Sequence, residues 1–373
     1  MDSRRKRRIG IASAAAGLGA AGLGAAVGIR KIAVGRVRLR PDPDAAEPFG
    51  SLRGRELTVV ADDGLPLHVE IDGDDKAPLT VVFTHGYCLN QDSWHYQRRD
   101  LGRDQAGLRM VFWDQRSHGR SGRSKPTHAT IDQTGSDLHA VLRATVRQGE
   151  PVVLVGHSMG AMTIMALADK HPELFGDPQA VTAHGRGDGA RVIGILMANT
   201  SSGDLSEMTL GLPLMLAKVV RPLAPGVIRS LSRRAEFVDW TRQAGADLAF
   251  IMIRRMGFAD KHVSPTMVDF VEQMIRGTTI DVIAEFYPTL MGHDKVKALE
   301  VLGRVPTVVL TGGADRLTPA AHGRAIAEAI PDTELIEVAE AGHLLPLEYP
   351  GIVTAAIRRL IGRADAASQE RLA

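Results

Sequence analysis

The chain has 373 residues, of which 44% are hydrophobic, so it can bury a large core and is not expected to be disordered. The chain has 45 basic and 43 acidic residues. Residues 1–40 contain ten basic residues and one acidic residue, so the rest of the chain contains 35 basic and 42 acidic residues. A mildly acidic body of this kind excludes a protein that binds nucleic acid over its folded surface. The single cysteine, Cys88, excludes an intrachain disulfide, and we expect a small buried or half-buried side chain there.

Residues 1–40 form a basic arm. Five basic residues at positions 4–8 precede an uncharged run, rich in alanine and glycine, at positions 9–29. A charged start followed by an apolar stretch is typical of an export signal or a membrane anchor, and a helix of this length can just span a bilayer. Because alanine and glycine insert weakly, a basic cytoplasmic tail or a helix lying on anionic lipid is the alternative. The arm therefore predicts a membrane-associated or exported protein.

Proline and acidic residues at positions 41–51 predict a linker, so the folded domain is expected to begin near Leu52. Two short strand patterns separated by a turn then predict an opening hairpin. The next apolar run predicts the first interior strand, which ends in His85, Gly86 and Tyr87. We expect His85 to hold this loop by hydrogen bonds rather than to act as a base.

Polar residues follow the next predicted strand. Asp114 and Arg116 are interpreted as an ion pair between adjacent loops, with a catalytic acid and an oxyanion clamp as the alternative. His118 lies in a turn rich in glycine, serine and arginine and is predicted to be structural. Helical periodicity at positions 131–147 predicts a crossover helix, with Asp137 as a surface charge. None of the motifs has metal-ligand spacing, so we expect no metal.

The most specific motif lies between a strand and a helix. The four apolar residues 152–155 predict a strand buried on both faces, and an apolar helix follows the motif. Residues 156–160 match the Gly-x-Ser-x-Gly pattern of a nucleophile elbow. In so tight a turn, side chains at Gly156 and Gly160 would collide with neighbouring backbone, and the hydroxyl of Ser158 is lifted clear of the sheet. Ser158 is therefore a candidate nucleophile.

From position 199 to about 301 the strand pattern gives way to helical patterns. Ser264 and Pro265 predict a helix start with a cap and a proline at its first position. Seven of the 13 methionines fall inside this insertion. Methionine is flexible and suits a pocket for apolar groups, but packing of helices against the sheet explains these side chains equally well.

A serine nucleophile requires a histidine base and an acid that orients it. Both follow the insertion. The strand pattern at 305–311 leads to Asp315, and the pattern at 334–338 leads to His343. The order Ser158, Asp315, His343 is the one expected when a nucleophile elbow belongs to a parallel α/β sheet. Strands are predicted at 56–60, 67–71, 79–84, 109–113, 152–155, 191–198, 305–311 and 334–338.

These motifs together resemble those of the α/β-hydrolase family, in the branch of serine esterases, lipases and cofactor-free haloperoxidases. The matching segments are residues 85–87, 113–121, 156–160, 313–319 and 342–348. The resemblance implies a mostly parallel central sheet flanked by helices, with a helical cap inserted before the acid-bearing strand. The implied division is a core at 52–198 and 302–363, a cap at 199–301 and a tail at 364–373.

The resemblance also implies roles for residues around the nucleophile. Backbone N–H groups of Tyr87 and Met159 would form the oxyanion hole. Supporting positions would be His85, Gly86, Gly156, His157 and Gly160. The implied reaction is acyl transfer on a lipophilic small-molecule ester through an acyl-enzyme, with no cofactor. Serine in the elbow, where epoxide hydrolases and haloalkane dehalogenases need aspartate, argues against those branches.

Several activities share this triad, so alternatives stay open. A thioesterase or a cofactor-free haloperoxidase acting as a perhydrolase is the enzymatic alternative. A non-catalytic binding protein on a hydrolase scaffold, anchored by its arm, is the alternative from another class.

Overall fold

The computed structural model describes residues 41–104, 107–176, 190–205 and 253–372. Within these residues, strands form one eight-stranded sheet in the order β1-β2-β4-β3-β5-β6-β7-β8. The strands are β1 (Arg55–Val60), β2 (Pro66–Asp72), β3 (Leu79–Thr84), β4 (Leu108–Trp113), β5 (Pro151–His157), β6 (Arg191–Ala198), β7 (Thr307–Gly312) and β8 (Glu334–Val338). The first two strands pair antiparallel, β2 pairs antiparallel with β4, and all other pairs are parallel.

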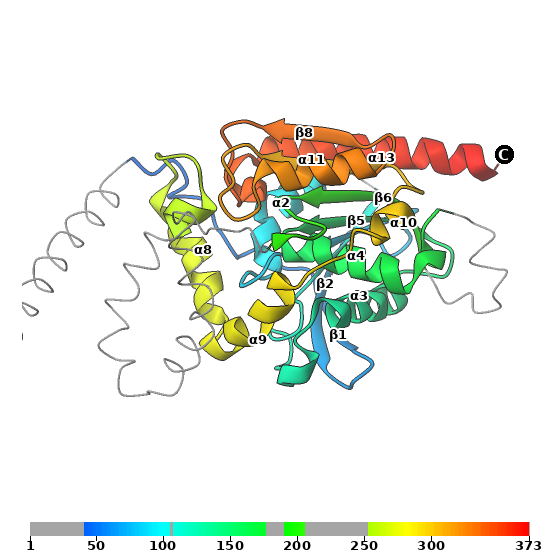
Figure 1. The fold of residues 1–373 in the computed structure, drawn as a ribbon, viewed down its shortest axis with the longest axis horizontal. Coiled ribbons are helices and arrows are strands. Elements are labelled where there is room, and N and C mark those ends of the chain that lie inside the picture. Colours follow the sequence, from blue (N-terminus) through cyan, green and yellow to red (C-terminus); the bar gives the residue numbers. More distant parts are fainter. Residues whose placement is uncertain (1–40, 105–106, 177–189, 206–252, 373) are drawn as a thin grey trace, which may run out of the picture.

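Helices cover both faces of this sheet (Figure 1), and its central strands are accordingly buried and mostly apolar. The α-helices are α2 (His95–Asp104), α3 (Ile131–Thr145), α4 (Met159–Lys170), α8 (Pro265–Gly277), α9 (Ile280–Met291), α10 (Ala298–Leu302), α11 (Ala320–Ala329), α12 (Leu345–Glu348) and α13 (Pro350–Leu372). Short 3₁₀ helices are η1 (Gln91–Trp94), η2 (Pro126–His128) and η3 (Pro172–Leu174). One apolar cluster joins the sheet to α3, α4, α10 and α11, and a second joins it to α2, α12 and α13. The predicted fold class and strand positions are confirmed.

Two helices of the predicted cap, α8 and α9, lie at the carboxyl ends of the parallel strands (Figure 1). Ser264 caps α8 by accepting a hydrogen bond of 3.3 Å from the amide of Met267, and Pro265 is the first helical residue, as predicted. Phe286 on α9 packs against Met162 of the elbow helix. The rest of the insertion, residues 206–252, lies outside the described residues.

The predicted linker at 41–51 is corrected by the structure, because this segment packs on the cap and on α2. Asp42 accepts a hydrogen bond of 2.6 Å from the hydroxyl of Thr266. Phe49 stacks on Phe270 of α8 at a centroid distance of 4.7 Å. Ordered packing therefore begins about ten residues before the predicted domain start at Leu52.

The predicted tail at 364–373 is also corrected, because α13 runs without interruption to Leu372. Ala364 on this helix is buried in the second apolar cluster. At the other boundary of the cap, Leu299 of α10 is buried in the first cluster and so packs with the core. No helix among the described residues is both long and apolar enough to cross a membrane, and the arm at 1–40 lies outside them.

Candidate active site

The turn between β5 and α4 holds Ser158 in a strained conformation. Its φ of 53° and ψ of −118° lie in a region that side chains with a Cβ rarely adopt. A Cβ on Gly160 would lie 2.1 Å from the carbonyl oxygen of Thr84, and one on Gly156 would lie 2.6 Å from the amide nitrogen of Ala161. Both elbow glycines are therefore required by close backbone approach, as the motif predicts.

Three loops at the carboxyl end of the sheet bring the predicted nucleophile, base and acid together. The Nε2 atom of His343 lies 3.0 Å from the Oγ of Ser158, and its Nδ1 lies 2.9 Å from Oδ2 of Asp315. Because an ionised carboxylate only accepts, Nδ1 carries the ring hydrogen, and Nε2 is left to accept from the serine hydroxyl. The three side chains thus form one directed chain of hydrogen bonds.

Asp315 is held by several donors besides His343. Its Oδ1 accepts from the amides of Leu317 at 2.7 Å and Thr318 at 3.0 Å, and its Oδ2 accepts from the hydroxyl of Thr318 at 2.8 Å. Burial alone would raise the pKa of Asp315, but the charge of His343 and these hydrogen bonds outweigh it and lower the pKa to about 2. The acid is therefore ionised at neutral pH.

Asn199 is a further residue of this site that sequence reasoning missed. It follows β6 at a positive φ of 47°, and its Nδ2 donates to Oδ2 of Asp315 at 2.6 Å and to the carbonyl of Gly342 at 3.0 Å. One amide group thus joins the acid to the loop that carries His343. The available signal was a polar residue directly after a buried strand, beside the strand of the elbow.

Two other histidines near the nucleophile are structural. Nε2 of His85 accepts from the amide of Gln115 at 2.9 Å, so its Nδ1 donates to the carbonyl of Gly86 at 2.8 Å, which confirms the predicted loop support. Nε2 of His157 lies 2.8 Å from the carbonyl of His343 and donates to it. Burial lowers the pKa of His85 and of His157 to about 3, so both rings are neutral and committed to the backbone.

Of the two predicted oxyanion residues, Tyr87 lines the pocket beside Ser158, and Met159 directly follows Ser158 in the chain. Met159 is the first residue of α4, where an α-helix leaves its N–H groups without an intrahelical acceptor. Tyr87 lines the pocket and donates its hydroxyl to the carbonyl of Ile283 on α9 at 2.6 Å. Next to it, burial raises the pKa of the Cys88 thiol to about 12, so that thiol is not a nucleophile at neutral pH.

The predicted pairing of Asp114 with Arg116 is wrong. Asp114 accepts from the amides of Gln91 and Arg120, each at 2.8 Å, and so ties two loops together without a guanidinium. Arg116 instead forms a two-pronged ion pair with Asp137, with both N–O distances at 2.6 Å. Asp137 is fully buried and not a surface charge. The planar guanidinium of Arg116 can donate two parallel hydrogen bonds to a carboxylate, and it does so to Asp137 on α3.

His118 has the structural role that the sequence predicts. Its Nδ1 lies 2.9 Å from the carbonyl oxygen of Arg116, and burial lowers its pKa to about 4. Its ring also packs edge-on against Phe286 of the cap. The residue therefore joins the turn after β4 to α9.

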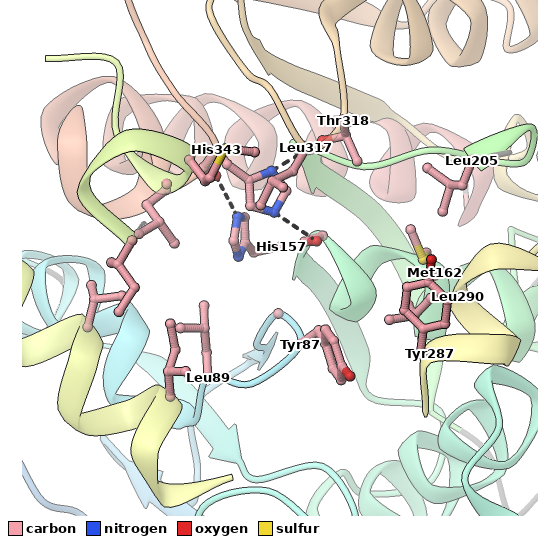
Figure 2. A pocket seen from close by; sticks show the side chains of 18 of the residues that line it. Tyr87, Leu89, His157, Met162, Leu205, Tyr287, Leu290, Leu317, Thr318 and His343 are labelled. Atoms are coloured by element: carbon pink, nitrogen blue, oxygen red, sulfur yellow. Dashed lines mark hydrogen bonds between the residues drawn. The ribbon is translucent and has the colours of Figure 1, made fainter. Parts of the chain in front are cut away.

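A pocket of about 350 Å³ opens beside Ser158 (Figure 2). Its apolar lining comes from the core and the cap: Leu89, Met162, Leu205, Ile253, Met256, Val271, Ile275, Leu290, Met291, Leu317 and Leu344. Of the cap methionines described, Met256 and Met291 line the pocket, whereas Met267 and Met274 are buried between cap and core. Both interpretations of the methionines thus hold, each for different residues.

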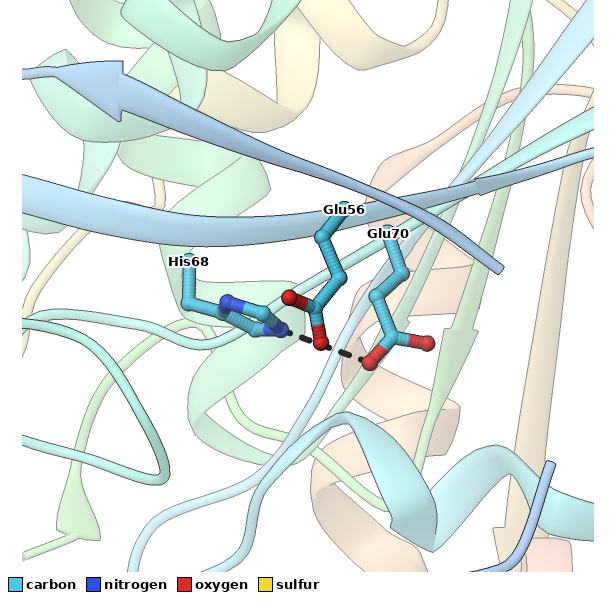
Figure 3. Close-up of side chains that lie close together, drawn as sticks. All are labelled: Glu56, His68 and Glu70. Atoms are coloured by element: carbon cyan, nitrogen blue, oxygen red, sulfur yellow. Dashed lines mark hydrogen bonds and ion pairs between the residues drawn. The ribbon is translucent and has the colours of Figure 1, made fainter. Parts of the chain in front are cut away.

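A separate cluster on the opening hairpin is an ion-pair network (Figure 3). Ligand atoms of Glu56, His68 and Glu70 lie within 4.8 Å of one another. Arg98 contacts Glu70 at 2.7 Å, and Arg120 contacts both Glu70 and Glu56. Burial alone would raise the pKa of Glu70, but its hydrogen bonds and the charge of Arg98 hold the pKa well below its usual range. Arginines already neutralise the charge that would attract a cation.

The fold and this site define a class of protein. A sheet with an elbow serine, a buried acid and a histidine on loops at the carboxyl ends of its parallel strands is the architecture of α/β hydrolases. The model of the alpha/beta hydrolase family matches residues 81–357, so the chain belongs to that family. Family membership supports a hydrolase with a small-molecule substrate.

Individual relatives are distant. AB hydrolase superfamily protein YisY of Bacillus subtilis is 24% identical over 265 residues, which cover 70% of this chain and 84% of the relative. A non-heme chloroperoxidase of Streptomyces lividans is 34% identical over 103 residues, which cover 28% of this chain and 35% of the enzyme. A thermophilic esterase from Thermogutta terrifontis superimposes with a TM-score of 0.61 at 24% identity, covering 83% of this chain and 99% of that chain. At that identity, the structural likeness shows the fold alone.

Proposed function

We propose that this protein is a serine hydrolase that cleaves neutral carboxylic esters with apolar acyl or alcohol groups. The observation that carries the proposal is the chain of hydrogen bonds from Ser158 through His343 to Asp315 at the wall of an apolar pocket. The buried, ionised acid supports an oriented imidazole, and the pocket lining supports an apolar substrate.

Acylation begins when Nε2 of His343 takes the proton of the Ser158 hydroxyl. The serine oxygen bonds to the ester carbonyl carbon, and the carbonyl electrons move onto its oxygen. As this tetrahedral intermediate collapses, the bond to the alcohol oxygen breaks and His343 returns the proton to the leaving alcohol. Asp315 keeps Nδ1 protonated and stabilises the imidazolium that forms in between.

Deacylation repeats these steps with water. His343 removes a proton from water, the oxygen attacks the acyl carbon, and the acid leaves as the proton returns to Ser158. In both halves the amides of Tyr87 and Met159 would donate to the oxyanion. Each such donor lowers the barrier by about 3 to 4 kcal/mol, because it is fixed before the charge appears.

Labelling with a fluorophosphonate probe tests the proposal. The folded wild-type protein should label and hydrolyse p-nitrophenyl esters, and Ser158→Ala should do neither. Ser201→Ala is the matched control, because Ser201 is a buried serine whose Oγ lies 2.9 Å from Nδ1 of His322, outside the triad. Folded wild-type protein that neither labels nor hydrolyses would refute the hydrolase and favour a binding protein on this scaffold.

A thioesterase or perhydrolase is the second candidate, favoured by the partial match to a chloroperoxidase. Matched esters and thioesters of one acid, together with a peracid assay in acetate and hydrogen peroxide, separate these activities. We expect the ester to have the highest kcat/KM. A thioester that reacts faster at equal acyl length would reassign the substrate class and leave the triad unchanged.

We also propose that residues 1–40 attach the protein to a membrane or direct its export. The support is the basic cluster followed by an uncharged run. The full chain should sediment with membranes, or appear outside the cytoplasm, and a chain lacking these residues should not. Equal distribution of both forms would assign the arm to a cytoplasmic tail.

A further inference from the structure

The polar groups of the active-site pocket are few, and most already have partners. Outside Ser158 and His343, the polar side chains that line it among the described residues are Tyr87, His157, Tyr287 and Thr318. Apart from the two histidines, none of the described lining side chains is ionisable near neutral pH, so this part of the wall presents no fixed charge to a substrate. A neutral ligand fits such a pocket, because burying a charged group there without a partner is costly.

Three of these four side chains are committed. The hydroxyl of Tyr87 donates to the carbonyl of Ile283 at 2.6 Å. The hydroxyl of Thr318 donates to Asp315 at 2.8 Å, and Nε2 of His157 donates to the carbonyl of His343. Each of these three groups already donates its hydrogen to another protein atom, so it is not free to donate to a ligand.

Tyr287 differs from them. It lies on α9, four residues after Ile283, and is half-buried on the pocket wall that also holds Met162 and Leu290 (Figure 2). Its hydroxyl forms no hydrogen bond with any part of the chain that the structure describes. A phenol placed among apolar side chains recovers a hydrogen bond when a ligand brings an acceptor to it.

We propose that Tyr287 is a specificity-determining residue whose hydroxyl donates a hydrogen bond to a second oxygen of the substrate. The substrate class is then a neutral ester that carries an ether, hydroxyl or carbonyl oxygen besides the scissile group. This inference rests on the proposed ester hydrolysis at Ser158. A half-buried donor on the pocket wall favours a substrate that brings an acceptor over an analogue that lacks one.

The test compares esters that differ by one atom. In one series, successive methylenes of the acyl chain of p-nitrophenyl hexanoate are replaced by an ether oxygen. In a second, the alcohol chain of butyl hexanoate is varied in the same way. For each pair, kcat/KM of the oxygen-containing ester is divided by that of its methylene parent, in the wild-type protein and in Tyr287→Phe.

At one oxygen position, this ratio should fall about threefold to tenfold in Tyr287→Phe, which corresponds to the loss of one hydrogen bond. Tyr96→Phe is the matched control. It removes a hydroxyl that donates to Asp44 and does not line the pocket, so it should change both members of a pair by the same factor. The position that responds assigns the second oxygen to the acyl or to the alcohol side.

Ratios that are equal in wild-type protein and Tyr287→Phe at every position would overturn this inference. Hydrolysis that still depends on Ser158 would leave the proposed function standing in that case. Absence of Ser158-dependent hydrolysis for all esters would instead refute the proposed function itself. A parallel fall in Tyr96→Phe would also count against Tyr287, because the effect would then not depend on a hydroxyl in the pocket.

Discussion

Asn199 donates to the same oxygen of Asp315 that accepts from His343. The amide is 2.6 Å from Oδ2, and the imidazole Nδ1 is 2.9 Å from it. Because Asn199 also donates to the carbonyl of Gly342, it sets the distance between the acid and the loop that carries the base. It is thus a positioning residue of the candidate triad, although it does not contact the nucleophile's hydroxyl.

Replacing Asn199 by alanine should lower stability near neutral pH and make it less dependent on pH in the acid range. The carboxyl of Asp315 has a pKa of about 2 in the folded protein, against an ordinary value of 3.8. Its stabilising contribution is therefore complete above about pH 4 and is lost as pH falls toward 2. Loss of one donor raises the folded pKa, so Asn199→Ala should cost about 1 to 2 kcal/mol above pH 4, and the cost should shrink below it.

Urea unfolding of wild-type protein and Asn199→Ala between pH 7 and pH 3 measures this difference. Asn90→Ala is the control, because Asn90 accepts only from the amide of Asp92 at the start of η1. Its cost should not vary with pH. A cost of Asn199→Ala that stays constant down to pH 3 would contradict the coupling to Asp315.

Asp315→Asn should lower kcat by about 10⁴-fold with a small change in KM, because the amide no longer fixes the reactive tautomer of His343. Asp114→Asn provides the contrast. Asp114 is buried and accepts hydrogen bonds from the backbone amides of Gln91 and Arg120, so its loss should lower stability more than kcat. Steady-state kinetics on a p-nitrophenyl ester decides between the two carboxylates, and a larger loss of kcat in Asp114→Asn would reassign the acid.

The apolar pocket predicts a chain-length optimum. For p-nitrophenyl esters, kcat/KM should rise by up to about fourfold per added methylene until the pocket is full. Ile275→Trp adds bulk to the lining and should move the optimum to shorter chains. Ile352→Trp, at an exposed position of α13, should leave it in place. A flat series in the wild-type protein would exclude the pocket as the acyl or alcohol site.

The buried ion pair between Arg116 and Asp137 should be costly to break. Arg116→Met leaves a buried carboxylate without its partner, so we expect a loss of about 3 to 5 kcal/mol in unfolding free energy. The pair between Arg324 and Glu337 is 50% and 34% exposed, and Arg324→Met should cost less than about 1 kcal/mol. Chemical denaturation of both variants measures the two losses of unfolding free energy. Equal losses would show that the buried pair stabilises the fold no more than the exposed pair.

The strands and the elbow were predictable because their signals are local. A run of apolar residues such as 152–155 indicates a strand buried on both faces, and the elbow glycines follow from contacts inside one turn. Ser158, Asp315 and His343 could be found because each follows a predicted strand, and parallel strands end at one edge of a sheet.

The features that the sequence did not reveal depend on partners far along the chain. Asp137 looks like a surface charge because only the fold brings Arg116 against it. Asn199 has no spacing that links it to Asp315, 116 residues later. The segment at 41–51 has the composition of a linker, but the aromatic ring of Phe49 finds Phe270 in the cap.

The bond from Tyr87 to Ile283 couples two movements. The backbone amide of Tyr87 is proposed to stabilise the oxyanion, and its hydroxyl donates a hydrogen bond to the carbonyl of Ile283 on α9. Movement of α9 away from the sheet would therefore either break this hydrogen bond or displace the loop between β3 and η1. The position of α9 and that of the proposed oxyanion loop are thus linked through a single side chain.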